Sequence, residues 1–306
     1  MGQSKRHHFI PQVHIRYFKG NEGYFVYDKE LSKIVTYNNS NSFFYRNNLN
    51  KKFNFRTSEI DTSIEEELGV IFDDNFNHHL NNISYWGIRQ LPGFSDLGEV
   101  EINPSLRFFF EYSLIGFFRR FSAEKSQEEN LIRDLELFRE IKDLPNLPEI
   151  ASKFEFANNE EFSLDKLMTQ MDTILDSIKS KLPELKYPVP IPTDLKALVP
   201  ENLCCELILS PNFDIALPDV GGLMYQSDDK NTWMGLEFKV VKSIELPLSK
   251  NMFIRIKNSD YLVDKSNKLI KVESKEEVFK INKKLFKASL REILFSNPED
   301  IDEVVK

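Results

Sequence analysis

The spacing of apolar residues changes along the chain, and this change limits the fold more than any other feature of the sequence. From Ser58 to about Ile83 they recur every three or four positions, which predicts an amphipathic helix. From Leu203 onward, short runs of apolar and β-branched residues predict strands instead. Between these regions, residues 183–192 include four prolines and cannot form regular structure. We therefore predict an α+β fold with a helical middle and a mostly antiparallel C-terminal sheet.

Capping residues and apolar faces predict the other helices. Asn103-Pro104-Ser105 precedes a segment that is apolar nearly all round, which is typical of a buried helix. Ser163 caps a segment with a one-sided apolar face. These helices are predicted from Leu106 to about Ser126, from about Gln127 to Ile141, from Leu164 to about Lys181, and from Glu276 to about Leu294, where a helix closes the sheet; a loop is expected over Trp86–Val100.

Two aromatic and β-branched runs, Tyr24–Tyr27 and Ile34–Tyr37, flank a polar segment and predict an N-terminal β-hairpin cap. The segment after Pro11 is predicted as a short helix or a strand. Later strands are predicted at Leu203–Leu209, Met234–Val241, Ser243–Leu246, Met252–Ile256, Tyr261–Val263 and Leu269–Val272. The chain thus divides into an N-terminal β region with a histidine motif (1–57), a helical region (58–182) and a β-rich region with a closing helix (183–306), which we expect to form one integrated domain.

Charge and cysteine content restrict the class of protein. The net charge of −8 argues against nucleic-acid binding by the protein surface as a whole. A local basic patch that binds nucleic acid is compatible with this net charge. Cys204 and Cys205 are adjacent, and neighbouring cysteines rarely form a disulfide because its geometry is strained. Free thiols fit a reducing cytosol. No window approaches 18 consecutive apolar residues, so we expect a cytoplasmic protein without a membrane partner.

The pair His7-His8 is the first candidate for chemistry, because imidazole is the commonest metal ligand and the usual physiological-pH base. It lies in a basic cluster with Arg16 that would attract an anionic ligand. A His pair beside Pro11 on an extended segment is similar to the ββα-metal nuclease module, in which a strand His activates water and a helical residue holds a divalent ion. We therefore consider His7 and His8 as catalytic, with His8 as base and His7 as metal ligand. The alternative is a pair that orders the N-terminus by hydrogen bonds.

Three other groups are candidates for ligand binding. Asp219 follows a strand in a turn, where carboxylates often bind ligands, and we consider it a metal ligand; turn chemistry explains the same residue. Arg119 and Arg120 end an apolar helix, where arginine pairs with a carboxylate or phosphate, or with the helix dipole. Asp74 and His78 form either an i, i+4 ligand pair or part of a solvated face. The fingerprints of P-loop, dinucleotide-binding and α/β-hydrolase proteins are absent from the sequence.

The opening segment KRHHFIPQVHIRYF resembles the start of a widespread bacterial family catalogued as domain of unknown function 4238. The matching positions are His7, His8, Pro11, Gln12, Ile15, Arg16 and Phe18. The similarity continues through FVYDKELSKI in the hairpin, through FFRRFSAEK with Arg119 or Arg120, and through VFKINKKLFKASLREILFS with Asn282. A Ser-Asp-Asn-Pro turn of the family corresponds here to Ser210-Pro211-Asn212 or Pro218-Asp219, so the chain departs from the family there. The resemblance implies a family and a fold, and it carries no activity.

Two classes of function agree with these residues, beside a purely structural role for His7 and His8. The first is a metal-dependent nuclease or phosphodiesterase, in host defence or a toxin-like role, that uses a divalent metal ion on nucleic acid or a nucleotide. The second is a non-catalytic sensor module whose His/Arg pocket holds an anion, a nucleotide or a partner chain. In either class, the expected ligand or phosphate contacts are Gln12, Arg16, Arg119, Arg120 and Asp219.

Overall fold

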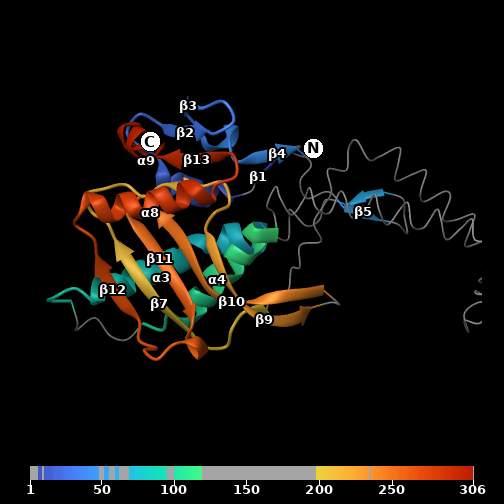
Figure 1. Ribbon diagram of the computed structural model, residues 1–306, viewed down its shortest axis with the longest axis vertical. Coiled ribbons are helices and arrows are strands. Elements are labelled where there is room, and N and C mark those ends of the chain that lie inside the picture. The colour runs from blue at the N-terminus through green and yellow to red at the C-terminus, as the bar shows by residue number, and fades with distance from the viewer. Residues whose placement is uncertain are drawn as a thin grey trace, which may run out of the picture.

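A five-stranded sheet forms the centre of the computed structural model (Figure 1), which describes residues 6–8, 10–47, 52–54, 59–61, 69–94, 100–118, 198–233 and 236–305. The strand order is β12-β7-β11-β10-β9. Neighbours are antiparallel, except that β12 pairs with β7 in parallel. The strands are β7 (Leu203–Leu209), β9 (Leu223–Trp233), β10 (Leu236–Ser249), β11 (Met252–Asn258) and β12 (Lys268–Lys271). The predicted α+β class is therefore confirmed.

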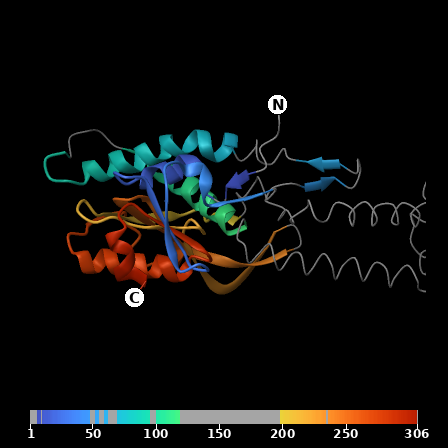
Figure 2. The same cartoon turned by 90° about the horizontal axis from the view of Figure 1, so that it is seen from above.

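Both faces of this sheet are buried. Successive side chains of a strand point to opposite sides, so neighbouring residues of one strand pack in different clusters. In β7, Leu207 belongs to one hydrophobic cluster and Ile208 to another. In β11, Ile254 and Phe253 divide between the same two clusters. The sheet is accordingly the middle of three layers, with helices on either side (Figure 2).

Helices α3 (Asp74–Arg89) and α4 (Asn103–Phe118) cover one face, and α8 (Lys275–Ala288) covers the other (Figure 2). α3 packs through buried residues at helical spacing, such as Phe76 and Ile83. It comes closest to the sheet at Gly87, where a Cβ atom would lie 2.7 Å from a methyl carbon of Leu207. α4 is buried over most of its surface, in agreement with its apolar sequence.

A second sheet, in the order β3-β2-β13-β8, joins the two ends of the chain. It contains the predicted hairpin, β2 (Tyr24–Asp28) with β3 (Lys33–Tyr37), and it adds β13 (Glu292–Phe295) and β8 (Leu217–Pro218). Smaller elements complete the described fold: the pairs β1 (Arg6–His8) with β4 (Tyr45–Asn47) and β5 (Lys52–Asn54) with β6 (Glu59–Asp61), the turns η1 (Arg16–Phe18), η2 (Ser40–Ser42) and η6 (Ser259–Tyr261), and the helix α9 (Glu299–Val305).

The first long helix begins and ends later than predicted. Strand β6 occupies Glu59–Asp61, where the helix was expected to start, and a π-helical turn, η3 (Gly69–Asp73), leads into α3. The helix continues to Arg89, so the predicted loop does not begin at Trp86. Trp86 is buried in the cluster against the sheet, and this tertiary packing extends the helix. The segment after Pro11 forms helix α1 (Gln12–Ile15).

The strand predictions near the C-terminus were correct only in part. One long strand, β10, replaces the two that were predicted, and β9 was not predicted because its polar residues have low strand propensity. Residues 261–263 are not a strand, because Asn258 caps the turn η6 by accepting from the Asp260 amide at 3.1 Å. The closing helix ends at Ala288, and Glu292–Phe295 form β13, which completes the second sheet between β2 and β8.

Several predictions fall on parts of the chain that are not described. These are the helices at about Gln127–Ile141 and from Leu164 to about Lys181, the proline-rich segment, and the proposed boundaries at 57/58 and 182/183. Among the described helices, none combines the length and the apolar character needed to cross a membrane.

Candidate functional site

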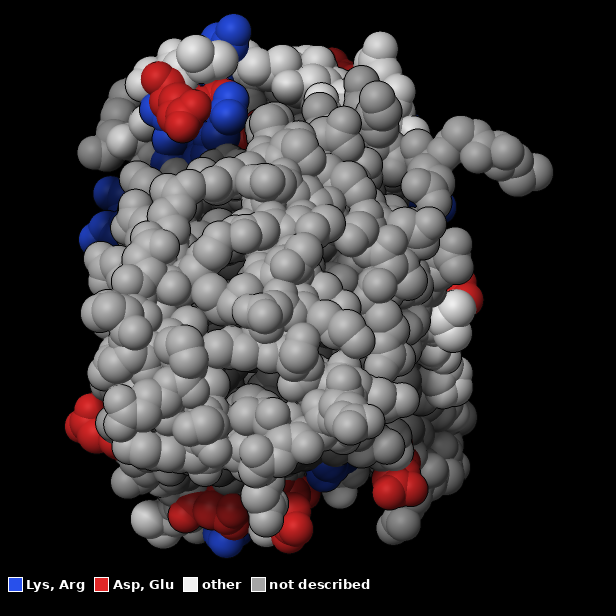
Figure 3. Space-filling view, turned by 90° about the vertical axis from the view of Figure 1, so that its right-hand side faces the viewer, with Lys and Arg blue, Asp and Glu red and all other residues white. Residues whose placement is uncertain are grey.

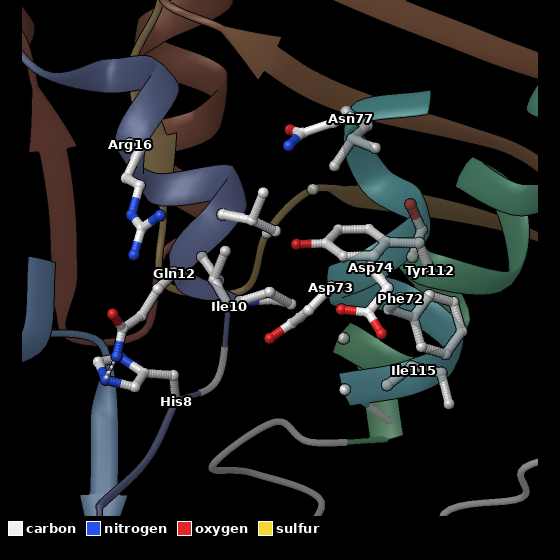
Figure 4. A pocket seen from close by; sticks show the side chains of 18 of the residues that line it. His8, Ile10, Gln12, Arg16, Phe72, Asp73, Asp74, Asn77, Tyr112 and Ile115 are labelled. Carbon is white, nitrogen blue, oxygen red and sulfur yellow. Dashed lines mark hydrogen bonds between the residues drawn. The ribbon is translucent and has the colours of Figure 1, made fainter. Parts of the chain in front are cut away.

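A cavity of about 610 Å³ lies where α1, the π-helical turn η3, α4 and the turn after β8 meet (Figure 4). These four segments are distant in sequence, so the cavity is a product of tertiary packing. Its polar lining includes His8, Gln12, Arg16, Asp73, Asp74, Asn77, Tyr112 and Ser113, and its remaining lining includes Ile10, Pro11, Val13, Gly69, Phe72, Ile115, Gly116, Val220, Gly221, Gly222 and Leu246. Three predicted ligand residues, His8, Gln12 and Arg16, are therefore brought together.

Helix α1 positions Gln12 and Arg16 on the cavity wall. Pro11 precedes the helix with φ −52°, and its carbonyl accepts from the amides of His14 and Ile15, which starts the turn. Residues four apart lie on one side of a helix, so Gln12 and Arg16 point the same way. Ile15, between them in sequence, is fully buried. Figure 4 shows the Arg16 guanidinium directed toward Gln12 along the wall.

His8 extends the same wall. Its backbone lies in β1, paired with Tyr45 of β4, and its Nε2 is 3.0 Å from Nε2 of Gln12. The side-chain amide of Gln12 is therefore within hydrogen-bonding distance of the His8 ring. Strand β1 is followed directly by α1, and its partner β4 comes after the hairpin β2–β3. The described segment therefore differs from the expected ββα order, in which a hairpin precedes the helix.

The opposite wall carries carboxylates. Asp73 ends the π-helical turn, and Asp74 begins α3. π-helical turns are often found at functional sites, since the additional residue in the turn redirects the side chains that follow. Asn77 lies one turn further, and its Oδ1 accepts from the hydroxyl of Tyr17 at 2.8 Å. Figure 4 shows Asp73 and Asp74 on the side of the cavity away from Arg16, Gln12 and His8.

His14, which was not a candidate, holds the two walls together. Its side chain is fully buried, with Nδ1 2.8 Å from the Tyr112 hydroxyl and Nε2 2.7 Å from the Pro247 carbonyl. A carbonyl only accepts, so Nε2 carries the proton and Nδ1 accepts from Tyr112. Burial lowers the pKa of His14 to about 3, against a smaller opposing effect of the Pro247 bond. The neutral ring thus ties α1 to α4 and β10.

The pair His78-His79 takes part in helix packing. His79 lies 3.0 Å from the Ser105 hydroxyl through Nδ1 and stacks on Phe108 at 4.2 Å between ring centres. Burial, and then the neighbouring His78, lower the pKa of His79 to about 4. Nε2 of His78 accepts from the amide of Asn82 at 3.3 Å. Neither histidine is among the described residues that line the cavity.

Asp219 is not among the described residues that line the cavity. Its carboxylate accepts from the backbone amides of Leu290 and Arg291, both at 2.8 Å, and of Glu292 at 3.0 Å. Burial raises the pKa of Asp219, and these three bonds act in the opposite direction. The residue therefore fixes the connection between α8 and β13. Arg119, Arg120 and the side chain of His7 lie outside the described residues.

Metal ligands were predicted at His7 and Asp219. Within the described parts of the chain, no three His, Cys, Asp or Glu side chains are grouped to hold a metal ion. Two carboxylates, those of Asp73 and Asp74, lie among the residues that line the cavity.

Sequence reasoning missed the acidic wall, and it did not place the Gly221-Gly222 turn in a cavity. Asp74 was considered only as a partner of His78, because the packing of α3 against α1 is not visible locally. Gly222 had a usable signal, a Gly-Gly pair after a strand, and it lies so close to β10 that a Cβ atom would be 2.5 Å from the Glu245 carbonyl oxygen. Gly221 has φ +75°, in the left-handed region that favours glycine.

Charged side chains of the described residues are of both signs on the face shown in Figure 3, with acidic groups along the lower edge and a mixed group at the upper left. This agrees with the net charge of −8. An anionic ligand would therefore be attracted by a local group, such as Arg16, and not by the surface as a whole.

The chain matches the model of the family described as protein of unknown function (DUF4238) over residues 6–299, and it belongs to this family. The resemblance of the opening motif is thereby confirmed. Comparisons with curated proteins and with solved structures find no match. The family description names no activity, so a functional proposal depends on the site itself.

Proposed function

We propose that the cavity binds a phosphate-bearing small molecule of nucleotide size together with a divalent cation. One observation carries the proposal: Arg16, Gln12 and His8 face Asp73 and Asp74 across a cavity of about 610 Å³. Ligand pockets for small molecules and cofactors have volumes of about 300–1,000 Å³, so the space suits a nucleotide.

The two walls supply complementary chemistry. The guanidinium of Arg16 offers a planar set of donors that matches phosphate oxygens, and the Gln12 amide adds a neutral donor. Asp73 and Asp74 offer hard oxygen ligands, and Mg²⁺ commonly uses one or two carboxylates with water and substrate phosphates as its other ligands. Apolar side chains such as Val13 and Phe72 complete the lining and suit a base or another flat group.

A second candidate function is hydrolysis of a phosphodiester in the same cavity. The observation that favours it is the imidazole of His8, which lies on the Arg16 wall and is held by Gln12. A neutral imidazole in this place is suited to accept a proton from water, and Arg16 would stabilise charge on the phosphoryl oxygens. A bound divalent cation would supply Lewis-acid activation of the phosphoryl group.

Calorimetric titration of the full chain with AMP and ADP, each with and without Mg²⁺, tests the binding proposal. We expect Arg16→Ala to weaken nucleotide binding about 10- to 100-fold, the value of one or two charge-assisted hydrogen bonds. Asp73→Asn with Asp74→Asn should abolish the Mg²⁺ dependence. Lys19→Ala and Glu22→Gln are matched controls at exposed positions outside the cavity lining. Equal binding by wild type and Arg16→Ala would contradict the proposal.

Release of nitrophenol from bis(p-nitrophenyl) phosphate, with Mg²⁺ or Mn²⁺, separates the two functions. Turnover that is lost in His8→Ala while nucleotide binding persists would establish hydrolysis. Binding without turnover in the wild type would exclude the second candidate and leave the first intact.

A further inference from the structure

The outward face of α8 carries a row of lysines. Lys280, Lys283, Lys284 and Lys287 are spaced i, i+3, i+4 and i+7, which places them on one side of the helix. Three of them are exposed and Lys283 is half-buried. They line a groove of about 490 Å³ together with Phe279 and Glu276. Figure 1 shows α8 lying across the sheet, and Figure 2 places it on the side away from α3.

This concentration of positive charge contrasts with the net charge of −8 of the chain. One of the four lysines is locally balanced, since Lys284 donates to Glu245 of β10 at 2.7 Å. The other three extend over about 10 Å of helix, at 1.5 Å per residue. Their three ammonium groups can contact up to three phosphates of a nucleic-acid strand.

Aromatic rings accompany the lysines. The ammonium group of Lys283 lies 4.8 Å from the ring centre of Phe279, and that of Lys284 lies 4.9 Å from the ring centre of Tyr225. Tyr225 is 37% exposed and Phe279 is half-buried at the groove. Lysines interleaved with accessible rings are typical of surfaces that bind single-stranded nucleic acid, where bases stack on the rings and phosphates meet the cations.

We propose that this face of α8 binds single-stranded nucleic acid. An acidic peptide would also be attracted by the lysines, but it would gain nothing from the rings of Phe279 and Tyr225. The surface lies on the other side of the central sheet from the cavity at α3 and α4. The inference therefore does not depend on the function proposed for the cavity.

Fluorescence anisotropy of the full chain with a labelled oligothymidine of about 16 nucleotides tests this proposal. Three phosphate contacts predict a slope of about −2 in log K against log salt, or about 16-fold weaker binding between about 50 and 200 mM salt. We expect Lys280→Glu with Lys283→Glu and Lys287→Glu to weaken binding at least about tenfold and to bring the slope near zero. The matched control reverses Lys19, Lys242 and Lys265, which are exposed elsewhere on the surface.

Phe279→Leu keeps an apolar side chain and removes the stacking surface, so we expect about 5-fold or greater weakening. The proposal is overturned if the control triple variant loses as much affinity as the α8 variant. It is also overturned if poly-glutamate competes as well as unlabelled oligothymidine and Phe279→Leu binds normally, because the surface then recognises negative charge alone. Thermal melting by circular dichroism checks that each variant is folded.

Discussion

Replacement of His14 by phenylalanine should remove a large part of the acid sensitivity of this fold. The imidazole is fully buried and is held neutral by the Tyr112 hydroxyl and the Pro247 carbonyl. It contacts the aromatic rings of Phe18 and Phe76, so a phenyl ring fits the same surroundings. Phenylalanine does not titrate, and the difference between the two proteins therefore isolates the protonation of this one residue.

The size of the effect follows from the pKa of His14, which is about 3 in the folded chain and about 6.5 in the unfolded one. Below pH 6.5 the unfolded chain binds a proton at His14 that the folded chain does not, so stability is lost as the pH falls from about 6.5 toward 3. Since pH 5 is about 1.5 units below the pKa of the unfolded chain, the free energy of unfolding is lower there by about 2 kcal/mol. Above pH 7 this contribution to stability is fully present.

Urea unfolding at pH 8 and pH 5 measures the effect. Between pH 8 and pH 5, the free energy of unfolding of the wild type should fall by about 2 kcal/mol more than that of His14→Phe. His79, whose pKa is also lowered by burial, adds a change of the same sign, and Asp219, whose pKa is raised by burial, adds the opposite one. Both are present in each protein and cancel in the comparison. The same pH dependence in wild type and variant would refute the reasoning, since His14 would then titrate alike in both states.

Four other substitutions test the packing of the fold by chemical denaturation. Tyr112→Phe should lower the free energy of unfolding by about 1–3 kcal/mol, because it leaves Nδ1 of His14 unpaired. The double variant with His14→Phe should lose less than the sum of the two single losses, since both partners of the hydrogen bond are then removed. Strictly additive losses would contradict a hydrogen bond between Tyr112 and His14. Gly222→Ala should lower the free energy of unfolding by about 1–3 kcal/mol, because its Cβ atom would lie 2.5 Å from the β10 backbone. At Gly116 on α4 the nearest atom would be 3.5 Å from the Cβ atom, so Gly116→Ala should be neutral or stabilising by up to about 1 kcal/mol. Similar losses in the two variants would refute the steric argument. Asp219→Ala should lower the free energy of unfolding by about 2–4 kcal/mol, because it removes three hydrogen bonds from backbone amides. Nucleotide and metal affinity should stay unchanged, and an altered metal affinity would support the predicted role of Asp219 as a ligand.

Local sequence signals were sufficient for elements that carry their own pattern. The strand Leu203–Leu209 and the hairpin β2–β3 were predicted nearly to the residue, because β-branched runs bounded by polar segments need no distant partner to be read. The boundary between α8 and β13 was missed for the opposite reason. The helix is followed by neither glycine nor proline, and the change to a strand is fixed by bonds from Asp219, which lies 71 residues away from Leu290.

The candidate site shows the same division between local and distant information. His8, Gln12 and Arg16 belong to one short motif, and the spacing of Gln12 and Arg16 by four residues places these two on a common face. Asp73 and Asp74 complete the cavity only because α3 packs beside α1, which no local pattern indicates. The predicted ligand Asp219 illustrates the converse, since a carboxylate that follows a strand serves turn geometry as readily as ligand binding.

Under the proposed function, the opening motif has two roles, one at the cavity and one in the buried core. Gln12 and Arg16 face the cavity, whereas His14, Ile15 and Phe18 are buried and fix the helix against α4 and the sheet. Residues of both kinds alternate within seven positions, so loss of activity after a change in this segment does not by itself identify a ligand contact. The two roles separate by measurement, because a change on the buried side lowers the free energy of unfolding, while Arg16→Ala at an exposed position should change ligand affinity and leave that free energy within about 0.5 kcal/mol.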